Sequence, residues 1–375
     1  MNDTVFRFAD DLGPQKIVHI CEPGLDLRAI LVVDNVAAGP SIGGTRMAPD
    51  VSLEECVRLA RAMTLKNAAA GLPHGGGKSV IFADPSMSAP GKEQIIRAFA
   101  CAIGDIADYI PGPDMGTDEQ CMGWVMDEIG RAAGLPREIG GIPLDEIGAT
   151  GFGLAAAAKV AKDYCGLDLK GARVAVQGFG AVGRHAARFL AEQGAVLVAA
   201  ADSTGTLVDR DGLDIEALVR LKDEGGRLID AKDGEKLDRE AIVGIDCDIW
   251  IPAARPDVLH EENVEQVKAR IILEGANIPA TEAAEQHLHE RGVLVVPDFI
   301  ANAGGVICAA VEFHGGSEAA AFEAIEEKIT RNTREVLEAM KTSGAQPRDA
   351  AIALAKKRVR KAMSTRRWSS RIRPR

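Results

Sequence analysis

The chain has 375 residues, of which 46% are apolar and 26% charged, and its formal net charge is −11. This length is enough for two domains with separate cores, and the composition excludes an intrinsically disordered chain. The acidic balance argues against nucleic acid as the main partner. No apolar run reaches the roughly 18–20 residues that cross a bilayer, so we expect no membrane anchor.

The seven cysteines are scattered along the chain and form no CxxC pair. Together with their odd number, this spacing predicts reduced thiols, a cytoplasmic location and no metal site. Residues 1–11 include three aspartates and lack the order of a secretory signal. Residues 356–375 hold ten basic side chains and no acidic one. We expect an amphipathic helix up to Met363 and then a tail, with a solvated face or subunit contact favoured over polyanion binding.

The first part of the chain mixes strands and helices. The predicted elements are strands at residues 17–22 and 27–34, a helix at 53–70 capped by Ser52, a short strand at 79–83 and a helix near 92–107. The segment 134–143 is rich in Gly and Pro, which predicts a hinge or loop.

A regular alternation follows. After a helix at 145–165, we expect strands at 173–177, 196–201, 248–251, 270–273 and 293–296, with helices between them and three more helices near 303–312, 317–341 and 348–363. Such alternation gives a parallel, doubly wound sheet. The predicted fold is therefore a two-domain α/β protein. An N-terminal substrate domain (residues 1–143) is completed by C-terminal helices (about 326–375), and residues 144–325 form a Rossmann-type dinucleotide-binding domain.

A dinucleotide site is predicted where the strand 173–177 ends. The GxGxxG sequence there consists of Gly178, Gly180 and Gly183 with Ala181 and Val182 between the last two. These glycines suit a tight turn, close approach of a pyrophosphate and close strand–helix packing, and the phosphates would sit on the helix N-terminus. Asp202 ends the next strand, 19 residues after Gly183. A carboxylate there accepts bonds from the ribose and repels a 2′-phosphate, which favours NAD over NADP, although the hydroxyls of Ser203 and Thr204 could accommodate a phosphate.

Residues 72–78 (LPHGGGK) are predicted to be neither a helix nor a regular strand. Their glycines would let a ligand reach the backbone, and Lys78 follows at the end. Lys66 lies twelve residues earlier. Two partly buried lysines that lie close together lower each other's pKa, and a lysine poised near about pH 7–8 is a competent general base. In the alternative interpretation, Lys66 is a helix-end cation and the glycines form only a turn.

Asp114 lies on a turn rich in Pro and Gly, where it would present a carboxylate. It could instead cap a helix that starts near Thr117, and Asp118 could serve either purpose.

These segments resemble the glutamate/leucine/phenylalanine/valine dehydrogenase family, and most of all its leucine, phenylalanine and valine members. The resemblance rests on residues 72–85 (LPHGGGKSVIFADP), 39–47 (GPSIGGTRM), 63–70 (MTLKNAAA), 113–117 (PDMGT), 149–153 (ATGFG), the GxGxxG unit, 247–253 (CDIWIPA), 274–277 (EGAN) and 297–306 (PDFIANAGGV). It implies an NAD-dependent, reversible oxidative deamination of an L-amino acid to a 2-oxo acid and ammonium. It also implies a homo-oligomer.

The resemblance also implies roles for single residues. Lys66 would bind the α-carboxylate, Lys78 would activate the attacking water, and Asp114 would exchange a proton with the substrate nitrogen. Thr150 and Asn302 would flank the nicotinamide, and Asn277 would orient ribose and substrate.

Two positions bear on the choice of amino acid. Glutamate enzymes of this family carry a lysine directly before the Gly-Gly pair, here Gly43 and Gly44, and a serine after the NAGGV segment. This chain has Ile42 and Ala309 there. A carboxylate buried against them would cost several kcal/mol, about 2–7 for an unpaired polar group and more for a charge, which favours an apolar branched-chain or aromatic substrate.

The C-terminal half resembles glutamate enzymes more, so glutamate dehydrogenase stays as the alternative. A dinucleotide-binding regulator without turnover is the alternative of another class. In each enzymatic interpretation we expect Lys66, Lys78 and Asp114 on one wall of an interdomain cleft and the GxGxxG turn on the other.

Overall fold

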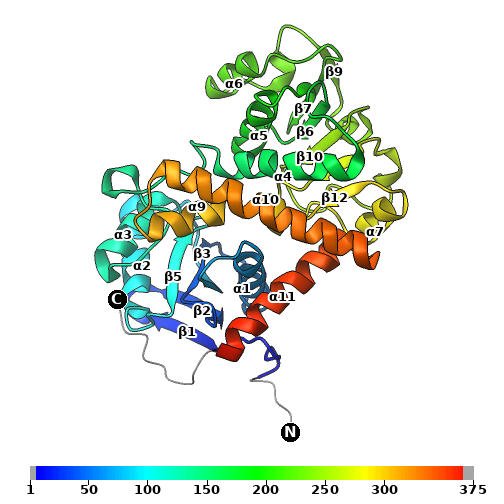
Figure 1. Cartoon of the computed structure of the whole chain (residues 1–375). Helices are drawn as coiled ribbons and strands as arrows, with labels where there is room; N and C mark the ends of the chain where they lie inside the picture. Colours follow the sequence, from blue (N-terminus) through cyan, green and yellow to red (C-terminus); the bar gives the residue numbers. More distant parts are fainter. Residues whose placement is uncertain (1–5, 366–375) are drawn as a thin grey trace. The chain divides into compact units, whose positions relative to one another are not determined.

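The computed structural model describes residues 6–365, so the last ten residues of the predicted basic tail lie outside the described part. The chain forms two compact units (Figure 1). Unit 1 consists of Met1–Pro143, Glu312–His314 and Ile352–Arg375, and unit 2 of Leu144–Val311 and Gly315–Ala351. Both units are built from helices and a β-sheet, which confirms the predicted two-domain α/β fold.

Unit 1 is built on a five-stranded sheet with the order β1-β2-β4-β3-β5. Its strands are β1 (Lys16–Glu22), β2 (Leu27–Asn35), β3 (Ser41–Met47), β4 (Gly75–Ile81) and β5 (Tyr109–Pro113). β2 is antiparallel to β1 and β4, whereas β3 is parallel to both β4 and β5. The carboxyl ends of β3, β4 and β5 therefore meet at one edge of the sheet.

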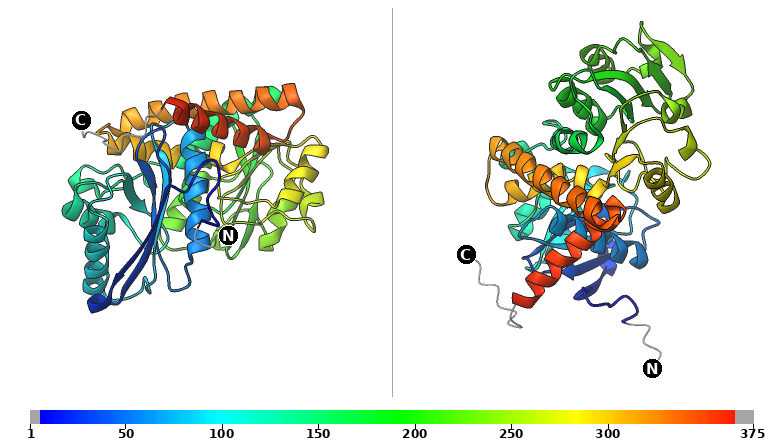
Figure 2. Two further views of the ribbon diagram at one scale, coloured as in Figure 1. Left: turned by 90° about the horizontal axis from the view of Figure 1, so that it is seen from below. Right: turned by 45° about the vertical axis from the view of Figure 1, so that its right-hand side comes forward.

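Helices cover both faces of this sheet. α1 (Leu53–Ala69) lies on one face, and α2 (Ala89–Ala102) lies on the other (left view of Figure 2), where α3 (Glu119–Ile129) packs beside it. Ser52 caps α1 as predicted, since its side chain accepts a hydrogen bond from Glu55 N at 3.1 Å. The core under α2 and α3 contains larger side chains, such as Phe99 and Tyr109, than the core under α1.

The glycine-rich segment is a regular strand, and the prediction that it could not be one was wrong. Gly75–Ile81 is fully buried and lies between β2 and β3. The glycines are needed because the neighbours come very close. A Cβ on Gly75 would lie 1.6 Å from Asn35 O, and a Cβ on Gly76 would lie 2.0 Å from Thr64 N of α1. β3 and β5 were not predicted as strands either, because each contains Gly or Pro, which are uncommon inside strands.

Unit 2 contains a seven-stranded sheet with the order β12-β11-β10-β6-β7-β8-β9. The strands are β6 (Arg173–Gln177), β7 (Val196–Asp202), β8 (Gly205–Val208), β9 (Glu235–Leu237), β10 (Ile249–Pro252), β11 (Ile271–Leu273) and β12 (Leu294–Val296). β12, β11, β10, β6 and β7 are parallel, as the alternation predicts. β8 and β9, which the sequence did not indicate, extend the sheet in antiparallel fashion.

The helices of unit 2 follow the predicted order. They are α4 (Ala149–Cys165), α5 (Ala181–Ala191), α6 (Ile215–Asp223), α7 (Glu282–Glu290), α8 (Asp298–Ala301), most of α9 (Gly304–Phe313), α10 (Glu318–Ser343) and the start of α11 (Pro347–Thr365). Short 3-10 helices lie at Leu228–Asp230, Arg239–Gly244 and Val264–Gln266 in unit 2, and at Pro23–Leu25 and Arg137–Ile139 in unit 1. α4 and α5 pack on one face of the sheet, seen beside the green strands in the right view of Figure 2.

The boundary expected near residue 326 differs from the one found. Residues 315–351, which include all of α10, belong to unit 2, and only residues from Ile352 onward join unit 1. The reason is packing, because α10 buries Ala321, Ile325 and Ile329 and lies along α4. Residues 312–314 at the end of α9 group with unit 1 instead. There the buried Glu312 accepts hydrogen bonds from the backbone N–H groups of Gly134, Leu135 and Ile142 at 2.7–3.0 Å.

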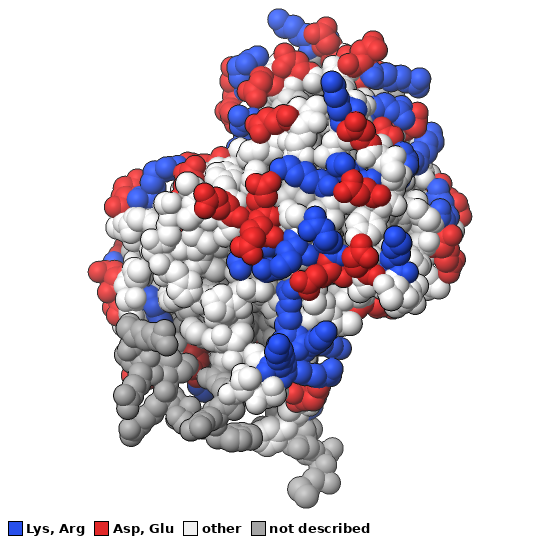
Figure 3. Space-filling model, viewed as in Figure 1, with Lys and Arg blue, Asp and Glu red and all other residues white. Residues whose placement is uncertain are grey.

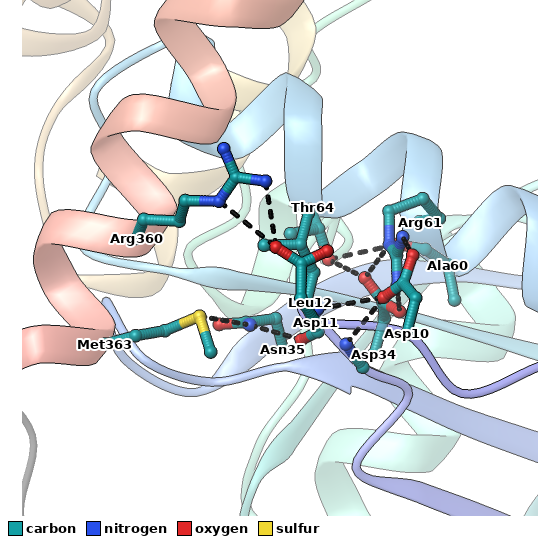
Figure 4. A network of polar contacts seen from close by, with 11 residues as sticks. Asp10, Asp11, Leu12, Asp34, Asn35, Ala60, Arg61, Thr64, Arg360 and Met363 are labelled. Carbon is teal, nitrogen blue, oxygen red and sulfur yellow. Dashed lines mark hydrogen bonds and ion pairs between the residues drawn. The ribbon is translucent and has the colours of Figure 1, made fainter.

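A polar network holds α1 on the sheet of unit 1 (Figure 4). The fully buried Asp34 of β2 accepts hydrogen bonds from Arg61 Nε at 2.8 Å and from Thr64 Oγ1 at 2.6 Å. Arg61 also donates to Asp10, and Arg360 of α11 donates to Asp11 at 2.8 Å. The N-terminal residues, β2, α1 and the end of α11 are thereby tied together within unit 1.

Positive charge gathers over the C-terminal half of α11 on the face shown in Figure 3. Part of this charge has a structural use, because Arg358 donates to Ala69 O at 2.7 Å and Arg360 binds Asp11. Among the described helices, none combines the length and the apolar character that a membrane span requires.

Candidate active site

The strongest candidate site lies in unit 1, where β3, β4 and β5 end. Lys78 of β4 and Arg46 of β3 both donate to Oδ2 of Asp114, which directly follows β5. The Arg46 Nε–Asp114 distance is 3.1 Å, and Lys78 forms a short ion pair with the same oxygen. Arg46 is fixed from its other side by Glu55 of α1. Two cationic side chains from neighbouring strands therefore converge on one carboxylate at the end of a third strand.

Because Gly44 has no side chain, there is space beside it in which Lys78 and Asp114 meet. The strand register places Thr45 opposite both Ser79 and Pro113, so Gly44 lies beside Lys78, with its missing side chain on the same face of the sheet. A Cβ on Gly44 would lie 2.7 Å from Asp114 Cβ and 3.0 Å from Lys78 Nζ. Gly43 serves packing instead, since its Cβ would lie 1.7 Å from Gly77 O. In addition, the buried Tyr109 hydroxyl donates to Gly43 O at 2.8 Å.

The pair is strongly perturbed by burial. Lys78 is only 5% exposed. Burial lowers its pKa, and although Asp114 acts in the opposite direction, Arg46 lowers the pKa further, so that it lies below the ordinary 10.5. Burial raises the pKa of Asp114, but Lys78 and Arg46 outweigh this effect and the pKa is lowered. Both directions are consistent because the Asp114 side chain is 22% exposed and has two cations, whereas Lys78 is more deeply buried and has one anion.

Lys66 lies in the last turn of α1 and is half-buried. The neighbouring Asn67 anchors this end of the helix, because its Nδ2 donates to Gly75 O at 2.7 Å. Thr64, three residues before Asn67 in α1, donates a hydrogen bond from its hydroxyl to Asp34. The helix end that carries Lys66 is thus fixed at the start of β4. A cation that the sequence did not suggest, Arg46, lowers the pKa of Lys78.

The helix-capping alternative for Asp114 is wrong. Asp118 is the N-cap of α3 and accepts from Cys121 N at 2.9 Å. Asp114 is held as part of a turn, since its backbone N–H donates to Thr117 Oγ1 at 3.0 Å while that hydroxyl donates to Thr45 O. Its carboxylate is therefore free to bind the side chains of Lys78 and Arg46.

Of the two positions that bear on the substrate, Ile42 lies in unit 1 and Ala309 in unit 2. Ile42 is buried in β3, two residues before Gly44 and on the same face of the sheet. Ala309 is partly exposed in α9. Neither side chain supplies a hydrogen-bond donor or a charge.

The GxGxxG turn of unit 2 connects β6 to α5 in the predicted way. Gly178 has a φ of 93°, a left-handed conformation that favours glycine. A Cβ on Gly183 would lie 2.1 Å from Gly178 O, so this glycine allows close strand–helix packing, whereas nothing lies within 4 Å of a Cβ on Gly180. Ala181 and Val182 form the partly exposed first turn of α5. The open backbone at Gly180 and the helix N-terminus fit a pyrophosphate.

Asn277 and Asn302 are in contact in unit 2, and Thr150 lies beside the start of α9, which follows Asn302. A Cβ on Gly305 would lie 3.2 Å from Thr150 Oγ1, so the start of α9 packs closely on the start of α4. Asn302 is 5% exposed, and its Nδ2 donates to Asn277 Oδ1 at 3.1 Å. Its Oδ1 is buried without a hydrogen-bond partner among the described residues. An unpartnered buried acceptor is costly and fits a ligand that donates a hydrogen bond, such as the carboxamide of a nicotinamide.

Asp202 ends β7, as predicted, but its surroundings were not foreseen. Lys222 Nζ of α6 lies 2.9 Å from its Oδ2.

Three residues of these sites, Arg46, Tyr109 and Lys222, were not predicted from the sequence. Arg46 lies in the GPSIGGTRM segment, two residues after Gly44. In a strand, this spacing places both residues on the same face of the sheet, and this could have indicated Arg46 from the sequence. No local signal connected Lys222 with Asp202.

Unit 2, with its largely parallel sheet and glycine turn, and unit 1, with its buried lysine–carboxylate pair, define a two-domain α/β dehydrogenase. Family models agree with this class. The model described as "Glutamate/Leucine/Phenylalanine/Valine dehydrogenase" matches residues 140–367, and the model described as "Glu/Leu/Phe/Val dehydrogenase, dimerisation domain" matches residues 24–131. The chain belongs to the glutamate/leucine/phenylalanine/valine dehydrogenase family and is an amino-acid dehydrogenase that uses a nicotinamide dinucleotide.

Individual relatives differ in what they are named for. The chain is 40% identical over 357 residues to a glutamate dehydrogenase of Aeropyrum pernix, which covers 89% of this chain and 85% of the relative. It is 40% identical over 364 residues to an NADP(+)-dependent glutamate dehydrogenase of Pyrobaculum calidifontis, covering 90% and 86%. The structure of an L-tryptophan dehydrogenase from Nostoc punctiforme is similar with a TM-score of 0.77 and 25% identity, covering 96% of this chain and 99% of the other.

Proposed function

We propose that this protein oxidatively deaminates an L-amino acid to its 2-oxo acid and ammonium, with Lys78 as the general base and Asp114 as its proton-exchanging partner. The observation that supports this assignment most directly is the buried Lys78–Asp114 pair beside the space left by Gly44. A lysine with a lowered pKa is neutral over a wider pH range and can accept a proton, while a carboxylate beside it can pass protons on.

In this proposal the substrate α-carboxylate binds Lys66, and the substrate nitrogen lies within reach of Asp114. A nicotinamide held by unit 2 would supply the oxidant for removal of a hydride from the substrate Cα. Neutral Lys78 then takes a proton from water as its oxygen attacks the imine carbon, which gives a carbinolamine. Asp114, which has accepted a proton from the substrate ammonium before the hydride leaves, returns it to the carbinolamine nitrogen. Ammonia then leaves as the carbonyl forms and takes up the hydroxyl proton to become ammonium. Amino acid, oxidised cofactor and water thus yield 2-oxo acid, ammonium, reduced cofactor and one proton.

Holding the cofactor falls to residues of unit 2. We assign the pyrophosphate to the turn formed by Gly178, Gly180 and Gly183 and the first turn of α5, and the nicotinamide to Thr150 and Asn302. NAD was expected from Asp202 alone. The ion pair of Asp202 with Lys222 weakens that expectation, because the charge meant to repel a 2′-phosphate is compensated.

The rate of deamination should rise with pH through the lowered pKa of Lys78. Burial is the main cause of this shift, and the base is active only when neutral, so kcat should increase towards alkaline pH with its inflection below 10.5. Measuring kcat from pH 6 to pH 11 tests this expectation. A profile that is flat across this range, in the absence of a rate-limiting product release, would contradict it. No turnover with any of the twenty L-amino acids would leave only the regulatory alternative.

For the substrate class we propose an apolar side chain. Ile42 and Ala309 support this choice, since they replace the lysine and serine that resemblance assigns to glutamate enzymes. Glutamate is the second candidate, and the names of the relatives at 40% identity favour it over the first. The L-tryptophan dehydrogenase with a similar structure supports the apolar class.

Replacing Ile42 by lysine should separate these candidates. If the substrate is apolar, Ile42→Lys introduces a buried cation that raises KM for the apolar amino acid and improves kcat/KM for glutamate by about 10-fold or more, because a carboxylate gains a charge-assisted partner. Steady-state kinetics with leucine, phenylalanine, tryptophan and glutamate, on the wild type and this variant, provide the measurement. A wild type that already prefers glutamate, and loses that activity on substitution, would establish the second candidate.

We also propose a homo-oligomer in the cytoplasm. The oligomer is supported by the match of residues 24–131 to a domain described as a dimerisation domain. The cytoplasmic location rests on the cysteine pattern of the sequence. Light scattering of the purified protein tests the assembly.

A further inference from the structure

The carboxylate of Asp202, at the end of β7, accepts hydrogen bonds from its own chain at both oxygens. Oδ2 of Asp202 accepts hydrogen bonds from Lys222 Nζ at 2.9 Å and from Leu228 N at 3.0 Å. Oδ1 accepts from Thr204 N at 2.8 Å and from Thr204 Oγ1 at 2.6 Å. A carboxylate offers about four acceptor positions, and all four are used here. The side chain is accordingly only 9% exposed.

This carboxylate keeps its charge, but the charge is balanced locally. Burial raises the pKa of Asp202, yet the hydrogen bonds from Thr204, Leu228 and Lys222 outweigh it and lower the pKa to about 2. Asp202 is therefore ionised under all working conditions. The ammonium of Lys222 is in direct contact with it, so the pair presents almost no net charge to a ligand at this edge of the sheet.

The surroundings offer donors to a further anion. The Lys222 side chain is 26% exposed and has three N–H donors, of which one is directed at Asp202. Ser203 and Thr204 are exposed at the turn after β7. Arg227 is exposed nearby, where its pKa is raised mainly by Asp230 and to a smaller extent by the charge of Asp202. An adenosine ribose placed at the end of β7 would meet these groups, because the strand after the glycine turn is where a Rossmann fold binds this ribose.

We propose that Lys222 determines cofactor selectivity by neutralising Asp202 and binding the adenosine 2′-phosphate, so that this protein accepts NADP as well as NAD. The inference rests on the proposed dinucleotide site of unit 2 and adds a residue from a different element, α6, to it. Asp202 then acts as a structural anchor for Lys222 and the Thr204 turn, and its hydrogen-bonding capacity is no longer available for selecting the unphosphorylated ribose.

Nucleotide fragments test this inference without any amino-acid turnover. Binding of 2′,5′-ADP and of 5′-AMP to the full chain is measured by titration calorimetry. The wild type should bind 2′,5′-ADP at least as tightly as 5′-AMP. Lys222→Gln should weaken binding of 2′,5′-ADP by about 10–100-fold, the usual effect of losing a charge-assisted hydrogen bond, and should change binding of 5′-AMP by less than about threefold.

Two further variants make the result specific. Lys222→Arg keeps the charge and should retain most of the 2′,5′-ADP affinity. Arg220→Gln removes the same charge from an exposed position of the same helix and should leave both affinities unchanged. The inference is overturned if the wild type binds 5′-AMP more than 100-fold tighter than 2′,5′-ADP, if Lys222→Gln weakens both fragments equally, or if Arg220→Gln has the same effect as Lys222→Gln.

Failure here and failure of the proposed function give different results. Amino-acid oxidation with NAD but none with NADP would overturn the role of Lys222 and leave the proposed function intact. Selective binding of 2′,5′-ADP without turnover of any amino acid would do the reverse. If neither fragment binds the wild type, the dinucleotide site fails, and this inference fails with it.

Discussion

Lys78→Ala should lower kcat for amino-acid deamination by about 10²–10⁴-fold, the usual contribution of a general base. The fold should tolerate the change, because Asp114 keeps Arg46 as a partner at 3.1 Å when the lysine is removed. Binding of the nicotinamide cofactor should persist, since the residues assigned to it lie in unit 2. Steady-state kinetics and cofactor binding by fluorescence measure the two effects separately.

Lys66→Ala is the matched comparison for this prediction. Its main effect should be a higher KM for the amino acid, because it removes a contact that the α-carboxylate makes in the ground state and the transition state alike. If Lys78→Ala keeps nearly the wild-type kcat, or if its main defect is lost cofactor binding, the buried pair serves stability and the proposed base is wrong.

Arg348→Met should destabilise unit 2 by about 3–5 kcal/mol, because it leaves buried carboxylates without their counter-ion. Arg348 of α11 bonds to Glu274 at 2.7 Å, to both oxygens of Glu285 at 2.7 Å and to Asp298 at 3.0 Å. The three acidic side chains are between 0% and 8% exposed. For a unit of this size, the loss corresponds to a decrease in Tm of roughly 6–20 °C by calorimetry.

The same network supports the cofactor site, so affinity should fall with stability. Asp298 accepts from Ile278 N at 2.9 Å and its own N–H donates to Glu274, which fixes the segment carrying Asn277 and the helix that precedes Asn302. Burial already raises the pKa of Glu274 well above its usual value. The destabilisation should therefore be smaller at mildly acidic pH, where this carboxyl holds a proton in the folded state and its charge need not be buried.

Arg331→Met provides the control for this second prediction. Arg331 lies on α10 and pairs with Glu327 at 2.8 Å, but both side chains are exposed. An exposed i,i+4 pair contributes only about 0.3–0.5 kcal/mol, so its loss should hardly change Tm. Equal decreases in Tm for the two variants would show that the buried network adds no more than a surface ion pair.

The sequence by itself determined the features that depend on neighbours along the chain. The alternation of strands with helices predicted the parallel strands of unit 2, and Ser52 marked the start of α1 because its cap contact lies three residues away. The GxGxxG spacing placed the turn after β6 and Asp202 at the end of β7. The glycine-rich segment and the Pro/Gly turn pointed to Lys78, Lys66 and Asp114, and the family motifs supplied a role for each.

Local propensity failed where distant neighbours decide the conformation. Glycines are poor strand formers in isolation, yet Gly75–Ile81 is the central strand between β2 and β3, because only glycine lets Asn35 and Thr64 approach so closely. For α10, too, the local sequence was not enough. Its amphipathic pattern predicts a helix but does not indicate which of the two units the helix packs against. That choice is made by its contact with α4.

Tertiary structure alone decided the chemistry of both sites. Lys78 and Asp114 are 36 residues apart, and Asp202 and Lys222 are 20 apart, so no sequence window reveals that they are in contact. Burial and ion pairing depend on the folded surroundings, and these set the lowered pKa of Lys78 and the compensated charge of Asp202. The sequence therefore determined which residue types were available at each site. Their pairing was decided by the strand order and the helix packing, because these bring together charges that lie far apart in the chain.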